Sequence, residues 1–195
     1  MPAAAVQTKK ILRAEALARR DALDAGWRTE ASLAMAGAAA QIAPSPGTAV
    51  SAFWPIRSEV DPRPLMAALA ERGARLCLPA ILDRTTIVFR EHLPGAPLVE
   101  MGFGTRGPGE GAAVLDPAVM LVPLAAFDAA GDRIGYGAGH YDRAIARLRG
   151  RGLAPRLVGV AFDCQRVGAV PAEAHDVRLD ALLSESGLRR FPLAP

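Results

Sequence analysis

A chain of 195 residues, of which 51% are hydrophobic, can bury one good core, and we expect a single domain spanning residues 1–195. A net charge of +3, no long run of basic residues and an aromatic content of 5% argue against a nucleic-acid-binding protein. The longest alanine-rich stretch, residues 31–43, is shorter than the roughly 20 apolar residues that span a bilayer, and no signal peptide is visible, so we expect a cytoplasmic protein without a membrane partner. Cys77 and Cys164 match no metal or redox spacing and are expected to be free thiols.

The first quarter of the chain has the pattern of two helices followed by a strand. Residues 7–23 place apolar side chains at helical spacing, with basic side chains largely on the other face. A second helix is expected over residues 27–42, because the punctuation Pro-Ser-Pro-Gly at 44–47 ends it. The run 48–54 then predicts the first strand.

The middle of the chain predicts a helix between strands and then a long loop. The helix over 61–73 has prolines in its first turn and Gly73 as its C-terminal cap. Strands are expected over 75–80 and 85–91, and a strand, helix, strand unit predicts a parallel sheet. Residues 94–111 are rich in Gly and Pro and predict a loop whose length indicates function or mobility.

The last third repeats the alternation of strands and helices. The apolar run 119–127 predicts a buried strand, followed by a helix over 141–149 and a strand over 156–162. The tail 180–191 predicts two short strands that are joined by Ser-Gly and close an edge. The whole pattern therefore predicts an α/β fold with a mostly parallel central sheet flanked by helices.

The most informative stretch is GDRIGYGAGHYDR at 131–143, which lies between a predicted strand and a predicted helix. Three of its glycines alternate with other residues: Gly135, Gly137 and Gly139. Glycine tolerates positive φ and has no Cβ, so the amide groups of such a loop can converge on an anion beside the positive end of the helix. Arg133 and Arg143 bracket the loop, whose spacing matches neither the dinucleotide fingerprint nor the P-loop. We expect a phosphate-binding loop.

Residues that follow other strand ends are candidates for the same site, because ligands of open α/β sheets bind at the carboxyl ends of strands. Phe53 and Trp54, followed by Glu59, would form an apolar wall with one acidic group for a flat, amine-bearing ring. They are alternatively core aromatics and a surface carboxylate. His140 and His175 are candidates for acid or base catalysis, because histidine as a residue type titrates near neutrality, or they are only packing or loop residues.

Two carboxylates are candidates for holding a divalent cation. Asp142 directly follows the glycine loop, where it would repel phosphate unless Mg²⁺ lay between them. The alternative is a helix N-terminal acid stabilised by the dipole. Asp176 is a possible second ligand or a solvated loop carboxylate.

Lysine usage gives a separate indication. Of 23 basic residues, 21 are arginine, and the two lysines are neighbours, Lys9 and Lys10. Retention of ammonium groups in an arginine-rich chain favours a compact charge beside a phosphate, although a solvated helix start explains it equally well.

The chain resembles the 5-formyltetrahydrofolate cyclo-ligase family, also called 5,10-methenyltetrahydrofolate synthetase. The signature half of that family is similar to three segments: VPLAAFDAAGDRIGYGAGHYDR, VGVAFDCQ and VPAEAHDVRLDALL. KKILR at 9–13 resembles the basic nucleotide-binding start of the family, and FWPIRSEVD at 53–61 resembles its folate-contacting segment. Because several motifs occur in the right order between residues 9 and 184, the resemblance is more specific than the glycine loop alone.

The resemblance implies an enzyme that uses ATP and Mg²⁺ to convert 5-formyltetrahydrofolate to 5,10-methenyltetrahydrofolate, with ADP and phosphate as co-products. In the family mechanism the formyl oxygen attacks the γ-phosphate to give an iminium phosphate, N10 closes the ring and phosphate leaves. It also implies a monomer with the three-layer α/β architecture of sugar-phosphate isomerases and CoA transferases. A relative that serves another salvage reaction, or that only binds nucleotide or folate, is the alternative.

The motif match also assigns roles to individual residues. ATP would be held by Lys9, Lys10, Arg13, Arg133, Gly135, Gly137, Ala138, Gly139 and Tyr141. The folate would meet Trp54, Glu59, Tyr136, Gly137, Gly139 and His140. Catalytic roles would fall to Lys9, Arg133 and Tyr141, and Mg²⁺ would be bound by Asp142 and Asp176.

The chain departs from the common family pattern at three positions. A frequent loop lysine, a tyrosine and an acidic residue are replaced by Ala138, His140 and Gly107. Loss of the lysine removes one γ-phosphate contact, and we hypothesise that Lys9, Lys10 or Arg133 supplies the missing charge.

Overall fold

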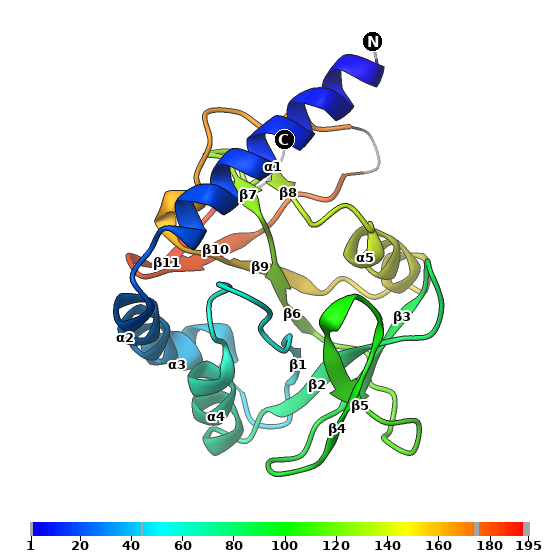
Figure 1. The fold of residues 1–195 in the computed structure, drawn as a ribbon. Helices are drawn as coiled ribbons and strands as arrows, with labels where there is room; N and C mark the ends of the chain where they lie inside the picture. The colour runs from blue at the N-terminus through cyan, green and yellow to red at the C-terminus, as the bar shows by residue number, and fades with distance from the viewer. Residues whose placement is uncertain (1, 44, 174–175, 193–195) are drawn as a thin grey trace.

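A computed structural model describes residues 2–43, 45–173 and 176–192. The chain folds around a seven-stranded sheet with the strand order β11-β10-β9-β6-β1-β2-β3 (Figure 1). Its strands are β1 (Ala49–Ser51), β2 (Arg75–Ile81), β3 (Ile87–Glu91), β6 (Val119–Pro123), β9 (Arg156–Val160), β10 (Ala181–Ser184) and β11 (Gly187–Arg190). The α-helices are α1 (Pro2–Asp21), α2 (Ala25–Met35), α3 (Ala39–Ile42), α4 (Arg63–Glu71) and α5 (His140–Gly150).

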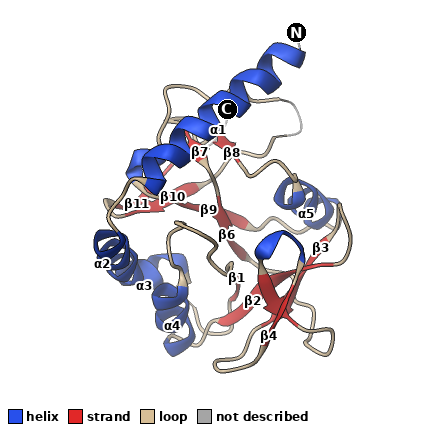
Figure 2. Cartoon of the chain, viewed as in Figure 1, coloured by secondary structure: helices blue, strands red, loops and turns tan. Residues whose placement is uncertain are grey.

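The sheet is parallel in its centre and antiparallel at both edges. β2, β1, β6, β9 and β10 pair in parallel with their neighbours, whereas the edge strands β3 and β11 run antiparallel. The parallel pairing follows from the helical crossovers between strands. Helices lie on both sides of the sheet (Figure 2), and the predicted α/β fold with a mostly parallel sheet is confirmed.

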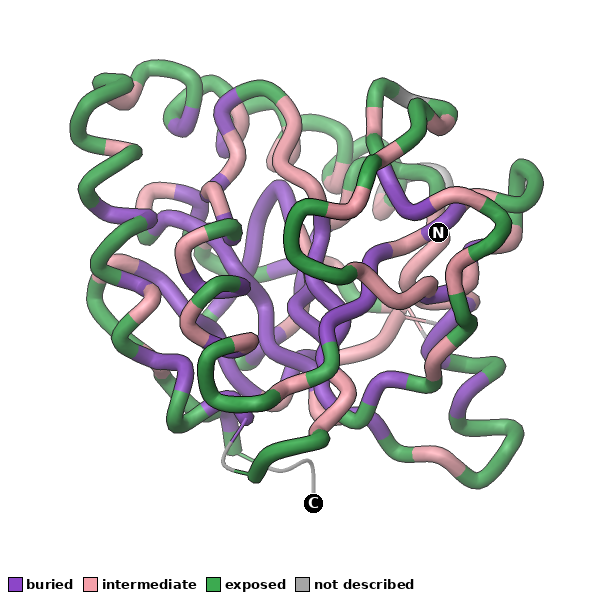
Figure 3. Tube along the Cα trace, turned by 90° about the horizontal axis from the view of Figure 1, so that it is seen from below, coloured by how far each residue is buried: buried purple, intermediate pink, exposed green. Residues whose placement is uncertain are grey.

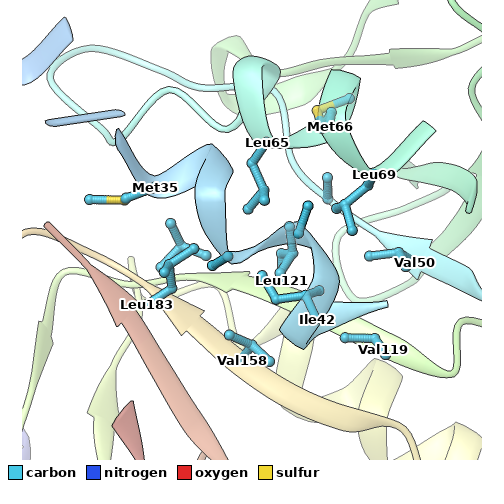
Figure 4. Close-up of a cluster of buried hydrophobic side chains, with 14 of the residues drawn as sticks. Met35, Ile42, Val50, Leu65, Met66, Leu69, Val119, Leu121, Val158 and Leu183 are labelled. Atoms are coloured by element: carbon cyan, nitrogen blue, oxygen red, sulfur yellow. The ribbon is translucent and has the colours of Figure 1, made fainter. Parts of the chain in front are cut away.

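Alternating side chains of the central strands belong to two separate hydrophobic cores, one on each face of the sheet. On one face, Val50, Leu121 and Val158 pack against α2, α3 and α4 (Figure 4). On the other face, Met120 and Val122 pack against α5. Burial on both faces explains why the sequence of β6 is a continuous apolar run. The buried strands pass through the middle of the molecule, and exposed segments surround them (Figure 3).

Several predicted boundaries are wrong, each for a local reason. The expected helix 27–42 is broken by a 3₁₀ turn, η1 (Ala36–Ala38), around Gly37, a poor helix former. The strand predicted over 48–54 ends at Ser51, because the following residues leave the sheet to line a pocket. The strand predicted over 119–127 ends at Pro123, which has no N–H to donate to a neighbour.

The two remaining hairpins lie outside the main sheet. Beyond Pro123 the chain forms β7 (Ala126–Phe127) and β8 (Arg133–Ile134), which pair antiparallel just before the glycine loop. The predicted loop 94–111 instead contains β4 (Leu98–Glu100), a short 3₁₀ turn η2 (Gly102–Gly104) and β5 (Arg106–Pro108). A third 3₁₀ turn, η3 (Asp163–Gln165), follows β9. The expectation of one long loop over 94–111 is therefore wrong.

Candidate active site

The candidate site lies where the chain direction across the sheet reverses. From β1 the chain moves to β2 on one side, and it later returns to β6 on the other side of β1. At such a switch point the segments that follow two neighbouring parallel strands separate and leave a crevice. The segment that follows β1 carries Trp54 and Glu59, and the segment that follows β6 leads into the glycine loop. Two adjoining pockets open here.

The first of these is a charged pocket of about 380 Å³, called the cationic pocket below. Four basic and two acidic side chains line it: Lys9, Arg13, Arg133, Arg143, Asp142 and Asp176. The rest of the lining comes from the glycine loop and two apolar neighbours: Gly135, Gly137, Ala138 and Gly139, with Ile134 and Ala146. Basic side chains in excess over carboxylates suit an anionic ligand.

The second is larger, about 780 Å³, and is called the apolar pocket below. It is lined mainly by apolar and aromatic side chains, among them Phe53, Trp54, Ile56, Ile87, Tyr136 and Tyr141. Its few charged or titratable groups are Glu59, Arg84, Arg106 and His140. A mostly apolar cavity with a few polar groups is the usual form of a small-molecule site.

The glycine loop forms the wall between the two pockets. Gly137 and Ala138 line both of them, while Tyr136 faces only the apolar one. Gly137 and Gly139 have φ values of +101° and +65°, which side chains with a Cβ rarely adopt. Gly139 is also the N-cap of α5, so the first amide groups of that helix begin at the loop.

Helix α1 lies against β7 and η3 and holds the glycine loop in place from one side (Figure 1). Arg13 Nε donates to the carbonyl of Gly135 at 2.7 Å. Lys9 Nζ pairs with Asp176 at 2.6 Å and with Glu173 at 3.0 Å. Burial lowers the pKa of Lys9, but the hydrogen bonds to these two carboxylates outweigh it and raise the pKa above its usual value.

The second carboxylate of the cationic pocket is paired as well. Arg133 Nη2 lies 2.7 Å from Asp142 Oδ1, and the same guanidinium donates to the carbonyl of Val177. Among the described residues no group of three His, Cys, Asp or Glu side chains is arranged to hold a metal ion. A divalent cation bound by Asp142 and Asp176 would therefore need further oxygens from a ligand, which is how magnesium is commonly bound at nucleotides.

A buried network supports the apolar pocket. Arg20, which is 2% exposed, donates to Ser58 Oγ at 3.0 Å and to the hydroxyl of Tyr136 at 2.5 Å. Tyr136 donates in turn to Glu59, whose Oε2 also accepts from the amide of Ile56 at 2.9 Å. Burial nevertheless raises the pKa of Glu59 above its usual value. The carboxylate is thus fixed in orientation at the wall of the pocket.

The indole of Trp54, in the apolar pocket, is held by contacts with Arg63 and His92. The guanidinium of Arg63 lies 5.4 Å from the ring centroid of Trp54, and His92 packs against the same ring at 6.3 Å in an edge-on arrangement. Burial raises the pKa of Tyr141, and its hydroxyl is buried without a hydrogen-bond partner among the residues that the structure describes. Tyr141, predicted to hold ATP, lines the apolar pocket.

With this geometry in place, the chain can be compared with known proteins. The model of the 5-formyltetrahydrofolate cyclo-ligase family matches residues 5–185. The chain belongs to this family. The 5-formyltetrahydrofolate cyclo-ligase of Escherichia coli K12 is 32% identical over 143 residues, which cover 70% of this chain and 78% of that protein. The enzyme of the same name from Haemophilus influenzae is 29% identical over 69% of this chain and 74% of its own length.

Solved structures agree with this assignment. A 5,10-methenyltetrahydrofolate synthetase from Aquifex aeolicus superposes with a TM-score of 0.76 at 29% identity, covering 96% of this chain and 94% of the other. The synthetase from Mycoplasma pneumoniae has the same fold, with a TM-score of 0.72 at 22% identity over 91% and 98% of the two chains. The family predicted from the sequence is confirmed, as is the expectation of an enzyme of this class. No helix in the described part of the chain is long and apolar enough to cross a membrane.

The structure places the three positions at which the chain departs from the common cyclo-ligase pattern. A Cβ on Gly107 would lie 2.5 Å from the carbonyl of Pro79, so β5 packs too closely on β2 for a side chain there. His140 Nε2 lies 3.0 Å from the carbonyl of Arg84, in the turn between β2 and β3. Ala138 has no charge to offer the shared wall, and two of the three residues hypothesised to replace it, Lys9 and Arg133, are paired with carboxylates.

Some residues of the site were not predicted from the sequence, and a residue with a predicted site role lies outside the two pockets. Arg20 was missed, although it follows Lys9 and Arg13 at helical spacing on one face of α1, a signal that could have found it. Lys10 is exposed and lies outside the cationic pocket. His175 lies outside the described residues.

Proposed function

We propose that this protein converts 5-formyltetrahydrofolate to 5,10-methenyltetrahydrofolate, consuming ATP and releasing ADP and phosphate, with Mg²⁺ as cofactor. The observation that carries the proposal is the shared wall: Gly137 and Ala138 line both the cationic and the apolar pocket. Transfer of a phosphoryl group to a formyl oxygen requires two different ligands to meet at one point. Membership of the cyclo-ligase family supports this pair of substrates.

The cationic pocket has the chemistry of a triphosphate site. Its basic side chains offer charge-assisted hydrogen bonds to phosphate oxygens, and the N-terminus of α5 adds amide groups and the positive end of the helix dipole. Asp142 and Asp176 would hold Mg²⁺ together with phosphate oxygens. Lys9 and Arg133, which neutralise these carboxylates here, are then available to the phosphates themselves.

The apolar pocket suits a folate. Its volume of about 780 Å³ is adequate for a ligand of this size, and the indole of Trp54 offers a flat apolar wall to a pterin ring. Glu59 would accept hydrogen bonds from the amino group of that ring, with its carboxylate held in place by Tyr136 and Ile56. The formyl group would then lie toward the shared wall.

The reaction requires residues that position the two substrates and supply positive charge, and it requires no nucleophilic side chain. ATP supplies the phosphoryl group that turns the formyl oxygen into a leaving group, so that N10 of the folate can close the ring. The glycine loop orients the two reacting groups, and the apolar walls keep competing water away. The buried hydroxyl of Tyr141 has no hydrogen-bond partner in the described part of the chain, and a donated hydrogen bond to the substrate would satisfy it.

The direct test is an absorbance assay for methenyltetrahydrofolate formed from 5-formyltetrahydrofolate with MgATP. We expect turnover that requires ATP and stops when the divalent cation is chelated. Absence of turnover, in protein that MgATP still stabilises against heat, would contradict the catalytic proposal and leave a binding protein. At a ligand concentration 100-fold above Kd that stabilisation is about 2.7 kcal/mol, which a thermal melt resolves easily.

A further inference from the structure

Arg143 lies at the junction of the two pockets. Its side chain lines the cationic pocket, and its Nη2 donates to the carbonyl of Ala138 at 2.6 Å. Its Nε donates to the carbonyl of Thr85 at 2.8 Å. Thr85 belongs to the turn between β2 and β3, whose Arg84 lines the apolar pocket. The guanidinium therefore bridges the glycine loop and the rim of the second pocket.

The positive charge of Arg143 is not neutralised by any carboxylate of the described residues. Lys9 and Arg133 form ion pairs with Asp176 and Asp142, but no ion pair of Arg143 is found within the described residues. Its two recorded hydrogen bonds go to neutral carbonyl groups and leave Nη1 without a protein acceptor in that part of the chain. Arg143 thus keeps both its charge and a donor for a ligand. Arg13, which donates to the carbonyl of Gly135, also forms no ion pair within the described residues, but only Arg143 of these two reaches the turn at the rim of the apolar pocket.

The position of this guanidinium suits a bound anion. Gly139 is the N-cap of α5, and a Cβ built on it would lie 2.8 Å from Arg143 Nη1. The guanidinium is therefore folded back over the N-terminus of the helix, where the dipole and the free amide groups already carry partial positive charge. An anion between them would stabilise both, and the pocket lies there.

We propose that Arg143 binds the terminal phosphate of ATP at the junction and supplies the positive charge that Ala138 lacks. The proposal rests on the proposed function, because the phosphate that reacts is the one nearest to the apolar pocket. Arg143 is the cation tied to both sides of that junction, through Ala138 and Thr85. The carbonyl hydrogen bonds hold the guanidinium fork in place, so little entropy is lost when the phosphate binds.

The test compares ATP with ADP, since only ATP carries the terminal phosphate. Calorimetric Kd values for MgATP and MgADP are measured on the wild type, R143M and R143K. We expect R143M to weaken ATP binding by about 10- to 100-fold, the range expected for one hydrogen bond to a charged group, and to change ADP binding less than about 3-fold. R143K, which keeps the charge, should recover part of the ATP affinity.

R149M is the matched control, because Arg149 is an exposed arginine of the same helix and lies outside both pockets. A purely structural role for Arg143 predicts equal losses of ATP and ADP affinity in R143M with no recovery in R143K, and that outcome would overturn the proposal. So would ATP binding by R143M as tight as by R149M. Should the wild type bind MgATP without turning over 5-formyltetrahydrofolate, the proposed function fails, whereas the comparison of ATP with ADP still decides the role of Arg143.

Discussion

Replacement of Arg20 by methionine tests whether the buried network holds the folate side of the site. Methionine keeps an unbranched apolar stem but removes the charge and the hydrogen bonds to Ser58 and Tyr136. Two hydrogen bonds from a charged donor are together worth roughly 3–6 kcal/mol. Relief from burying a guanidinium offsets part of this, so we expect the free energy of unfolding to fall by roughly 2–4 kcal/mol.

For a domain of this size, such a loss lowers Tm by roughly 5–15 °C. Arg19 is the matched control: it is the adjacent residue, is exposed, and also makes two hydrogen bonds, to the carbonyls of Cys164 and Arg166. Because these bonds face water, R19M should cost less than about 1 kcal/mol. Urea denaturation of R20M, R19M and wild type measures the difference.

The same variant has a functional readout. Without Arg20 the hydroxyl of Tyr136 loses its anchor, so the hydrogen bond from Tyr136 to Glu59 is no longer held in place. We expect the KM for 5-formyltetrahydrofolate to rise about tenfold in R20M while the KM for ATP changes little, since Arg20 does not line the cationic pocket. A variant as stable as R19M with an unchanged folate KM would refute the idea that this network positions the pocket.

Two further substitutions address the charged groups of the site. Because burial raises the pKa of Glu59, its contribution to stability is complete below the unfolded-state value of 4.5 and is lost as the pH rises through the higher folded-state pKa. E59Q should therefore gain stability relative to wild type as the pH rises above 4.5 in paired urea titrations. A constant difference across that range would contradict the burial argument. K9M leaves Asp176 and Glu173 without their shared cation and should lower the free energy of unfolding by roughly 1–2 kcal/mol and raise the KM for ATP, whereas the exposed K10M should do neither. Equal effects of the two lysine variants in melts and kinetics would show that Lys9 has no special role.

Some features of this chain follow from local sequence because their causes are local. The helical periodicity of α1 and the strand pair β10–β11 around Ser-Gly were predicted correctly. So was the preference for glycine in the loop before α5, where positive φ values occur at Gly137 and Gly139. Backbone sterics and apolar periodicity act within a few residues, so they are visible without a fold.

Other features depend on what lies across the molecule. The hairpin β4–β5, which was missed, packs through β5 against β2, where a Cβ on Gly107 would lie 2.5 Å from the carbonyl of Pro79, a residue far away in the sequence. The pairing of Lys9 with Asp176 joins residues separated by 167 positions, and no spacing rule reports such a contact.

The sequence by itself determined the family, the α/β fold and a phosphate-binding loop that is expected at Gly135 to Gly139. Tertiary structure decided that this loop is a wall between two pockets of opposite character, because β1 and β6 are neighbours only in the folded sheet. It also decided which charges are free, since an ion pair depends on distance in space. That is why Arg143, which brackets the loop in the sequence, becomes a candidate phosphate ligand only in the fold.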